Sequence, residues 1–138
     1  MLEQRAAAVS VYDKQLAAFP AGRLAKLAQY ERLTALYGDG KYDEVLKAAA
    51  AFVEPPEEMV DNIYWMGAEA AVALQRADVA VQNCRLLVDK CPKSPFVKDA
   101  LYRLGWLSQK QEAWESASSW FLQVAGRFPE DPLAAKSL

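Results

Sequence analysis

Apolar side chains recur at spacings of three and four residues along the whole chain, and short polar segments interrupt them. This spacing places the apolar residues on one face of an α-helix, whereas a strand would alternate apolar and polar residues. The pattern therefore predicts an all-α fold without strands. Seven main helices are expected, at residues 2–18, 21–37, 41–53, 57–74, 77–90, 95–109 and 112–127. A short eighth helix is expected to begin at residue 132.

Four prolines divide this helical pattern at nearly equal intervals. Pro20, Pro56, Pro92 and Pro129 are separated by 36, 36 and 37 residues. Proline cannot continue the interior of a helix, so each one marks a helix end. A fixed period between about 20 and 50 residues is typical of repeat proteins. We therefore expect one domain, residues 1–138, built from a half repeat 1–20, full repeats 21–56, 57–93 and 94–130, and a partial repeat 131–138.

The residues around these prolines strengthen the repeat. A small residue followed four positions later by a larger one, as in Ala117 and Phe121, precedes three of the prolines. Ser94-Pro95 and Asp131-Pro132 lie 37 residues apart and each has the sequence of a helix N-cap followed by proline. The expected core comprises Leu33, Leu46, Ala80, Leu87, Leu101, Leu104, Ala117 and Phe121. The lack of a side chain at Gly105 is expected to let neighbouring helices approach closely.

The phase of the repeat indicates how the array begins and ends. Residues 2–19 align with a second helix of a repeat, and residues 132–138 align with the start of a first helix. We interpret the chain as an excerpt of a longer array that starts and stops within repeats. Ala7, Val11, Leu133 and Ala134 would then be exposed at the ends and could mediate self-association.

Composition narrows the class of protein. Hydrophobic residues make up 53% of the 138 residues and charged residues 25%, which indicates a folded globular chain and excludes a disordered one. The net charge of −2, with both signs interspersed, predicts no nucleic-acid surface. Apolar runs such as 48–53 are far too short to cross a bilayer, so no membrane insertion is expected.

The residue types that usually carry chemistry are scarce. The chain has no histidine, which removes the commonest general base and metal ligand. Cys84 and Cys91 lie seven residues apart on one predicted helix, too far for a disulfide, and are expected to pack as small apolar side chains. Glu57, Glu58 and Asp61 sit where acids cap a helix N-terminus. We therefore expect no catalytic residues, no metal site and no cofactor.

The repeat resembles the tetratricopeptide repeat family, in which each unit is a pair of antiparallel helices. In residues 94–130 the residues that match the family pattern are Leu101, Leu104, Gly105, Trp114, Ala117, Phe121, Val124 and Pro129. The resemblance extends over essentially the whole chain and implies a right-handed α-solenoid of about seven or eight helices. The length of the units and their aromatic–proline ends are most similar to bacterial periplasmic members, such as the TolA-binding coordinator of the Tol–Pal system. The compartment suggested by this likeness is the periplasm, with the cytoplasm as the alternative.

The resemblance also implies where a partner would bind. First helices of such repeats line a concave groove, whose inward positions here are Trp65, Glu69, Asp99, Tyr102, Trp106 and Gln109, with Glu31 in the first full repeat. Most aromatic residues of the second helices or their starts are expected to pack between helices instead; these residues are Tyr12, Tyr42, Trp114, Trp120 and Phe121. Some family members hold a carboxy-terminal peptide with basic and asparagine residues, but the matching positions here do not hold that set, and the groove residues include Asp99 and Glu69.

The expected function is that of a non-catalytic protein–protein interaction scaffold, which binds a peptide or a helix of a partner protein in this groove. Trp106 and Tyr102 would be its aromatic anchors, with Trp65 on the adjacent first helix and the acids at the rim. If instead all three rings were buried between helices, the groove would be polar and this hypothesis would lose its basis. The alternative function is a structural module that associates with itself end to end.

Overall fold

A computed structural model of the chain describes residues 9–11, 13 and 22–129. Six complete helices lie within these residues: α2 (Arg23–Gly38), α3 (Tyr42–Ala51), α4 (Glu57–Ala73), α5 (Ala77–Lys90), α6 (Val97–Lys110) and α7 (Trp114–Arg127). Residues 9–11 and 13 are also helical, and no strand occurs in the described part of the chain. The predicted all-α fold is confirmed. The helix expected to begin at residue 132, like Ala7, Leu133 and Ala134, lies outside the described residues.

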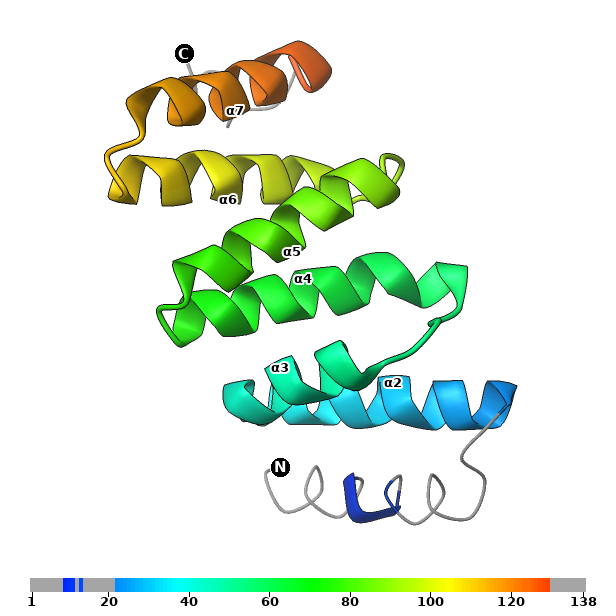
Figure 1. The fold of residues 1–138 in the computed structure, drawn as a ribbon. Helices are drawn as coiled ribbons and strands as arrows, with labels where there is room; N and C mark the ends of the chain where they lie inside the picture. The colour runs from blue at the N-terminus through cyan, green and yellow to red at the C-terminus, as the bar shows by residue number, and fades with distance from the viewer. Residues whose placement is uncertain (1–8, 12, 14–21, 130–138) are drawn as a thin grey trace.

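The helices stack in chain order, and neighbours run in opposite directions (Figure 1). Helices pair as α2 with α3, α4 with α5 and α6 with α7, while α3 also packs on α4 and α5 on α6. The second helices α3 and α5 therefore each contact both their own first helix and the first helix of the next pair. This arrangement is compatible with the expected solenoid.

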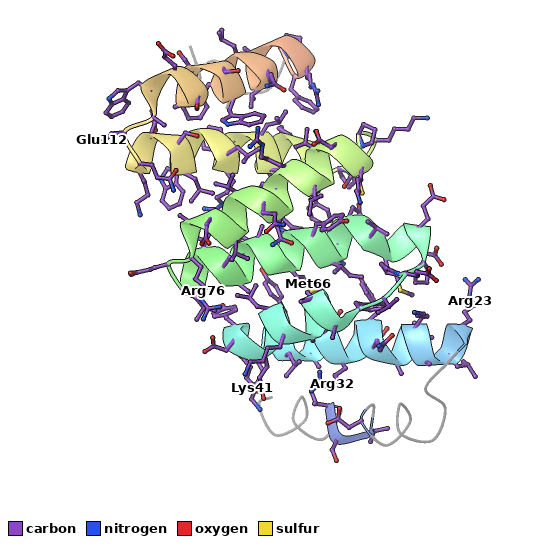
Figure 2. All side chains as sticks on the ribbon, in the orientation of Figure 1. Arg23, Arg32, Lys41, Met66, Arg76 and Glu112 are labelled. Carbon is purple, nitrogen blue, oxygen red and sulfur yellow. The ribbon has the colours of Figure 1, made fainter. Side chains whose placement is uncertain are left out.

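The turns within the three helix pairs have one backbone structure. Each turn has three residues, and the second has a positive φ: 74° at Gly40, 58° at Gln75 and 57° at Glu112. In each, the N–H of the third residue donates to the carbonyl five residues earlier, at distances of 2.8–3.0 Å. Figure 2 shows Lys41, Arg76 and Glu112, which belong to these turns, along one edge of the stack. The repeat in the sequence is thus also a repeat of backbone conformation, because the positive-φ residues of successive turns lie 35 and 37 residues apart.

Two of these turns hold a side chain where glycine is the preferred residue. A left-handed backbone conformation costs an L-residue about 1 kcal/mol relative to glycine. We expect Gln75→Gly and Glu112→Gly each to raise the free energy of unfolding by roughly 0.5–1 kcal/mol, and Gly40→Ala to lower it by a similar amount. A Cβ atom at Gly40 would meet nothing within 4 Å, so the effect there is one of backbone alone. Urea unfolding of the three variants checks this, and no change at Gln75→Gly would contradict it.

Most of the expected core is buried. Six of the eight residues have at most 3% of their surface exposed, namely Leu33, Ala80, Leu87, Leu101, Leu104 and Ala117. Leu46 and Phe121 are only half-buried, so their predicted full burial is wrong. Leu46 lines a surface groove between α3 and α5, and Phe121 belongs to α7, the last described helix.

Trp114 departs furthest from expectation, since 63% of its surface is exposed. It is the first residue of α7, and no described helix follows α7 to cover that side. Val11, at the other end, is exposed as expected.

Gly105 has the role that was predicted for it. A Cβ atom at this position would lie only 2.4 Å from the ring of Phe121, so the ring occupies the space that a side chain would need. Gly105 lies seven residues before the positive-φ residue of its turn, and Phe121 lies nine residues after it. The equivalent residues are Ala68 and Cys84 in the second helix pair, and Leu33 and Ala49 in the first. As the first-helix residue grows from glycine to alanine to leucine, the second-helix residue shrinks from phenylalanine to cysteine to alanine.

Most helix ends lie one or two residues from their predicted positions; for example, α2 begins at Arg23 and not at residue 21, and α7 begins at Trp114 and not at residue 112. Helix α3 ends at Ala51, two residues early, and the chain then turns through Glu54, whose φ is 47°. Helix α6 begins at Val97 and not at residue 95, and its N-cap is Phe96, not the predicted Ser94. Ser94 Oγ instead accepts the N–H of Phe96 at 3.1 Å, in the turn before the helix. The same Oγ donates to Asp61 Oδ2 of α4 at 2.6 Å, so Asp61 links two successive repeats.

Both cysteines are free thiols. Burial raises the pKa of the Cys84 thiol from 9.0 to about 12, and burial together with nearby Asp61 raises the pKa of Cys91. Only the thiolate reacts, so at pH 8 we expect Ellman's reagent to label half-buried Cys91 slowly and Cys84 only after unfolding in guanidinium. Cys91→Ser should abolish the native reaction. Equal labelling of the two thiols in the native protein would contradict this assignment.

Within the described residues, none of the helices combines the length and the apolar character needed to cross a bilayer.

Candidate partner-binding groove

A hollow of about 560 Å³ lies between the first helices α4 and α6. Its lining residues are Trp65, Asp99, Tyr102, Arg103 and Trp106. Trp65 comes from α4 and the other four from α6, where they lie at spacings of one, three and four residues. That spacing brings their side chains to one face of the helix.

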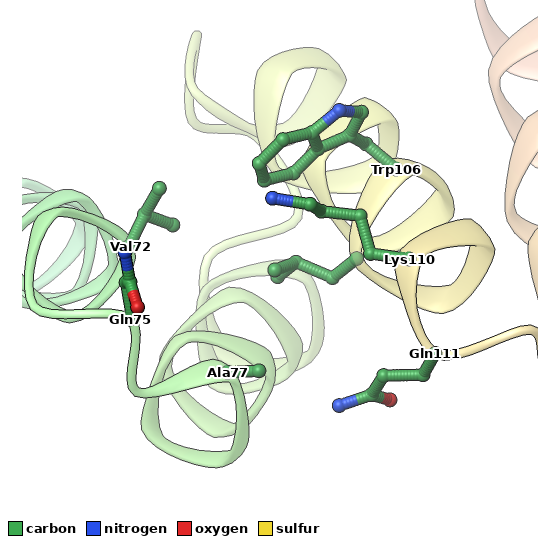
Figure 3. Close-up of a pocket in the computed structure, with 7 residues that line it drawn as sticks. Val72, Gln75, Ala77, Trp106, Lys110 and Gln111 are labelled. Carbon is green, nitrogen blue, oxygen red and sulfur yellow. The ribbon is translucent and has the colours of Figure 1, made fainter.

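A second hollow, of about 370 Å³, continues past Trp106 toward the ends of α4 and α6. Its lining residues are Val72, Gln75, Ala77, Trp106, Leu107, Lys110 and Gln111. Figure 3 shows Trp106, Lys110 and Gln111 on one side of this hollow and Val72, Gln75 and Ala77 on the other. Because Trp106 lines both hollows, we treat them as one feature, the α4–α6 groove. Its second part has an apolar base of Val72, Ala77 and Leu107 and a polar rim.

Trp106 is the central residue of the groove. Its indole is half-buried, so part of the ring remains available to a ligand. Lys110 Nζ lies 4.4 Å from the ring centroid and the guanidinium carbon of Arg103 lies 5.4 Å from it. Cations within about 6 Å of an indole attract its π-electrons. These contacts hold the ring in one orientation and place two positive charges beside it.

Neighbouring aromatic rings position the other two anchors. Trp65 stacks on Phe96 with a centroid separation of 5.6 Å and an interplanar angle of 13°. Tyr102 packs against Phe121 of α7, also at 5.6 Å, with an angle of 57°. Both side chains are half-buried. One part of each ring therefore packs against its aromatic neighbour, and the rest of the ring lines the groove.

An ion pair crosses the groove wall. Arg103 Nη2 donates to Glu69 Oε1 at 2.6 Å, linking α6 to α4, and the two side chains are only 28% and 25% exposed. The predicted acidic character of the rim is changed by this contact, because Glu69 is neutralised by Arg103. Asp99 has no ion-pair partner among the described residues. The groove thus presents acidic Asp99 at one end and basic Lys110 at the other.

Four of the six groove residues expected from the sequence line the first hollow together: Trp65, Asp99, Tyr102 and Trp106. Glu69 contacts this group through Arg103. Gln109 is exposed on α6 and lines neither hollow, and neither does half-buried Glu31 of α2.

Arg103 and Lys110 were missed by the sequence reasoning. They lie three residues before and four residues after Trp106, a spacing at which helical side chains are neighbours, so the sequence contained a signal for them.

Side chains that commonly bind metal ions do not form a cluster in the described part of the chain. No group of three or more histidine, cysteine, aspartate and glutamate residues is placed there to hold a metal ion. The groove's chemistry is therefore that of aromatic faces, aliphatic side chains and isolated charges, which suits contact with another polypeptide. Comparison of the sequence with models of known protein families and with curated proteins found no match.

Proposed function

We propose that this chain is a tetratricopeptide-like α-solenoid that acts as a non-catalytic interaction scaffold and binds a peptide or helix of a partner protein in the α4–α6 groove. The observation that carries the proposal is the convergence of three half-buried aromatic side chains, Trp65, Tyr102 and Trp106, on one hollow between two first helices. Aromatic residues in such settings are enriched among binding hot spots.

The composition of the groove suggests which segments would bind. Val72, Ala77 and Leu107 form a surface for an aliphatic or aromatic side chain, next to the face of Trp106. Lys110 at one end and Asp99 at the other favour a segment with an acidic and a basic residue at opposite ends. A short amphipathic helix or an extended peptide could meet both charges while its apolar side chains contact the indole.

Selection of peptides from a random display library on the immobilised protein tests this proposal. Selected peptides should share an apolar residue and should not bind the Trp106→Ala variant. Peptides that bind the wild type and Trp106→Ala with equal affinity would show that the α4–α6 groove is not the site. Circular dichroism of the variant establishes that it is folded, so that loss of binding can be assigned to the groove.

A second candidate function is end-to-end self-association. It is favoured by the outer face of α7, where Trp114 and Leu122 are 63% and 60% exposed. Sedimentation velocity over a range of concentrations separates the two functions, because only self-association would increase the mass of the protein alone. A role in the bacterial cell envelope is supported only by the resemblance of these repeats to those of periplasmic proteins.

A further inference from the structure

A second groove lies on the other side of α4, between the second helices α3 and α5. It has a volume of about 380 Å³ and shares no residue with the α4–α6 groove. Most of its lining is apolar. The residues that line this α3–α5 groove are Leu46, Ala49, Ala50, Ile63, Tyr64, Gly67, Arg76, Val79, Gln82, Asn83 and Leu86.

The chain contains a second copy of this junction, formed by α5, α6 and α7. Counting from the positive-φ residue of each turn, α3 corresponds to α5 with a shift of 35 residues, and α4 and α5 correspond to α6 and α7 with a shift of 37. The hydrogen bonds that end α5 and α7, Cys91 N–H to Leu87 and Phe128 N–H to Val124, confirm the second shift. The two junctions can therefore be compared residue by residue.

A tryptophan occupies the second junction. Trp120 is half-buried against the core cluster that contains Leu87, Leu104 and Val124, and the guanidinium carbon of Arg85 lies 5.6 Å from its ring centroid. The residue equivalent to Trp120 in the first junction is Asn83.

At three positions the first junction holds a smaller side chain than the second, whereas Ile63, Arg76 and Val79 are larger than their equivalents Ala100, Ala113 and Ser116. Asn83 stands in place of Trp120, Gly67 in place of Leu104, and Ala50 in place of Arg85. All three smaller residues line the α3–α5 groove. The Asn83 amide lies over Gly67, since a Cβ atom there would come within 2.9 Å of Asn83 Oδ1. An amide fills only part of the space that an indole takes, and the groove of about 380 Å³ lies beside it.

We propose that the α3–α5 groove binds a tryptophan side chain of a partner polypeptide, in the place that Trp120 occupies one repeat later. Leu46, Ile63 and Leu86 would contact the indole. Arg76 is the one charged residue among the described residues that line the groove, and its exposed guanidinium lies 3.7 Å from Asp43 Oδ1 of α3, which is itself exposed. A tryptophan flanked by acidic residues would therefore be preferred. This site is separate from the α4–α6 groove, and either could exist without the other.

N-acetyl-tryptophanamide is the probe, titrated into ¹⁵N-labelled protein and followed by NMR. We expect shifts in the amide signals of groove residues, with a Kd of about 1–10 mM, because a single side chain gains limited affinity. N-acetyl-alaninamide should cause no such shifts. The peptide acetyl-Glu-Trp-Glu-amide should bind more tightly than N-acetyl-tryptophanamide at low salt.

Two variants of one residue form a matched pair. Asn83→Ala leaves the groove open and should retain binding, whereas Asn83→Trp supplies the indole from the chain itself and should abolish binding and raise the melting temperature. If Asn83→Trp does not fold, the double variant Gly67→Leu/Asn83→Ala, which restores the leucine of the second junction, should weaken binding at least tenfold. In Trp106→Ala, the probe should shift the amide signals of the α3–α5 groove residues as it does in the wild type.

Three results would overturn the proposal. One is the absence of shifts in groove residues at about 20 mM probe, well above the expected Kd. Another is unchanged binding to a folded variant whose groove is filled. The last is an association of the wild type with itself that increases with concentration and is abolished by both Trp114→Ala and Asn83→Trp. The groove would then bind the exposed Trp114 of a second copy and not a separate partner.

Discussion

Replacing Gly105 with leucine should lower the free energy of unfolding by roughly 3 kcal/mol or more, one of the largest effects of any single substitution in this chain. The Cβ atom alone would lie 2.4 Å from the Phe121 ring, closer than unbonded carbon atoms approach. Gly105 is buried between α6 and α7, so the added side chain has no route to solvent. The two helices would have to separate or Phe121 would have to leave its place against Tyr102.

A double-mutant cycle makes the cause specific. Phe121→Ala alone should cost roughly 2–3 kcal/mol, less than for a fully buried ring, because Phe121 is half-buried. Gly105→Leu combined with Phe121→Ala reproduces the leucine–alanine pair that Leu33 and Ala49 form in the first helix pair. The double variant should therefore be more stable than Gly105→Leu, with a coupling energy of about 2 kcal/mol or more.

Urea unfolding followed by circular dichroism measures all three variants. Gly126→Leu is a suitable control, because a Cβ atom at Gly126 meets nothing within 4 Å and the residue also lies in a helix. If the costs of Gly105→Leu and Phe121→Ala simply added, the proposed exchange of volume between the two positions would be wrong.

Truncation of Trp106 should weaken binding of a groove ligand by about thirtyfold or more, equivalent to at least about 2 kcal/mol. The indole lines both hollows of the α4–α6 groove, and its removal also leaves Arg103 and Lys110 without the ring beside which they lie. Isothermal titration with a peptide selected on the wild type gives the affinity.

Trp114→Ala is the matched control, since it removes an indole that is 63% exposed and lines neither hollow. Its affinity for the peptide should equal that of the wild type. Lys110→Met should lower the association rate for an acidic peptide, mainly at low salt, because Lys110 is exposed and its charge is screened at high salt. An equal loss of affinity in Trp106→Ala and Trp114→Ala would point to a general disturbance and remove the case for the groove.

The sequence alone determined the helical class, the number and order of helices in the described part, and their ends to within two residues. These features depend on local properties: the spacing of apolar residues and the prolines that stop helices. The role of Gly105 could also be predicted, because a glycine within a strongly apolar helix indicates close approach of another element. Trp65, Asp99, Tyr102 and Trp106 were placed on one surface because the repeat relates α4 to α6.

Only the tertiary structure decided which aromatic residues are covered. Trp114 and Trp120 both lie on α7, yet Trp114 is exposed and Trp120 is covered in part by Arg85 of α5, a contact between residues 35 positions apart. Likewise, Arg103 reaches Glu69 across 34 positions and neutralises an acid that the sequence left at the rim. The α3–α5 groove is lined by Ala50, Gly67 and Asn83, which lie on three different helices. Burial and charge pairing depend on the sum of such distant neighbours, whereas a helix depends on residues within four positions of each other.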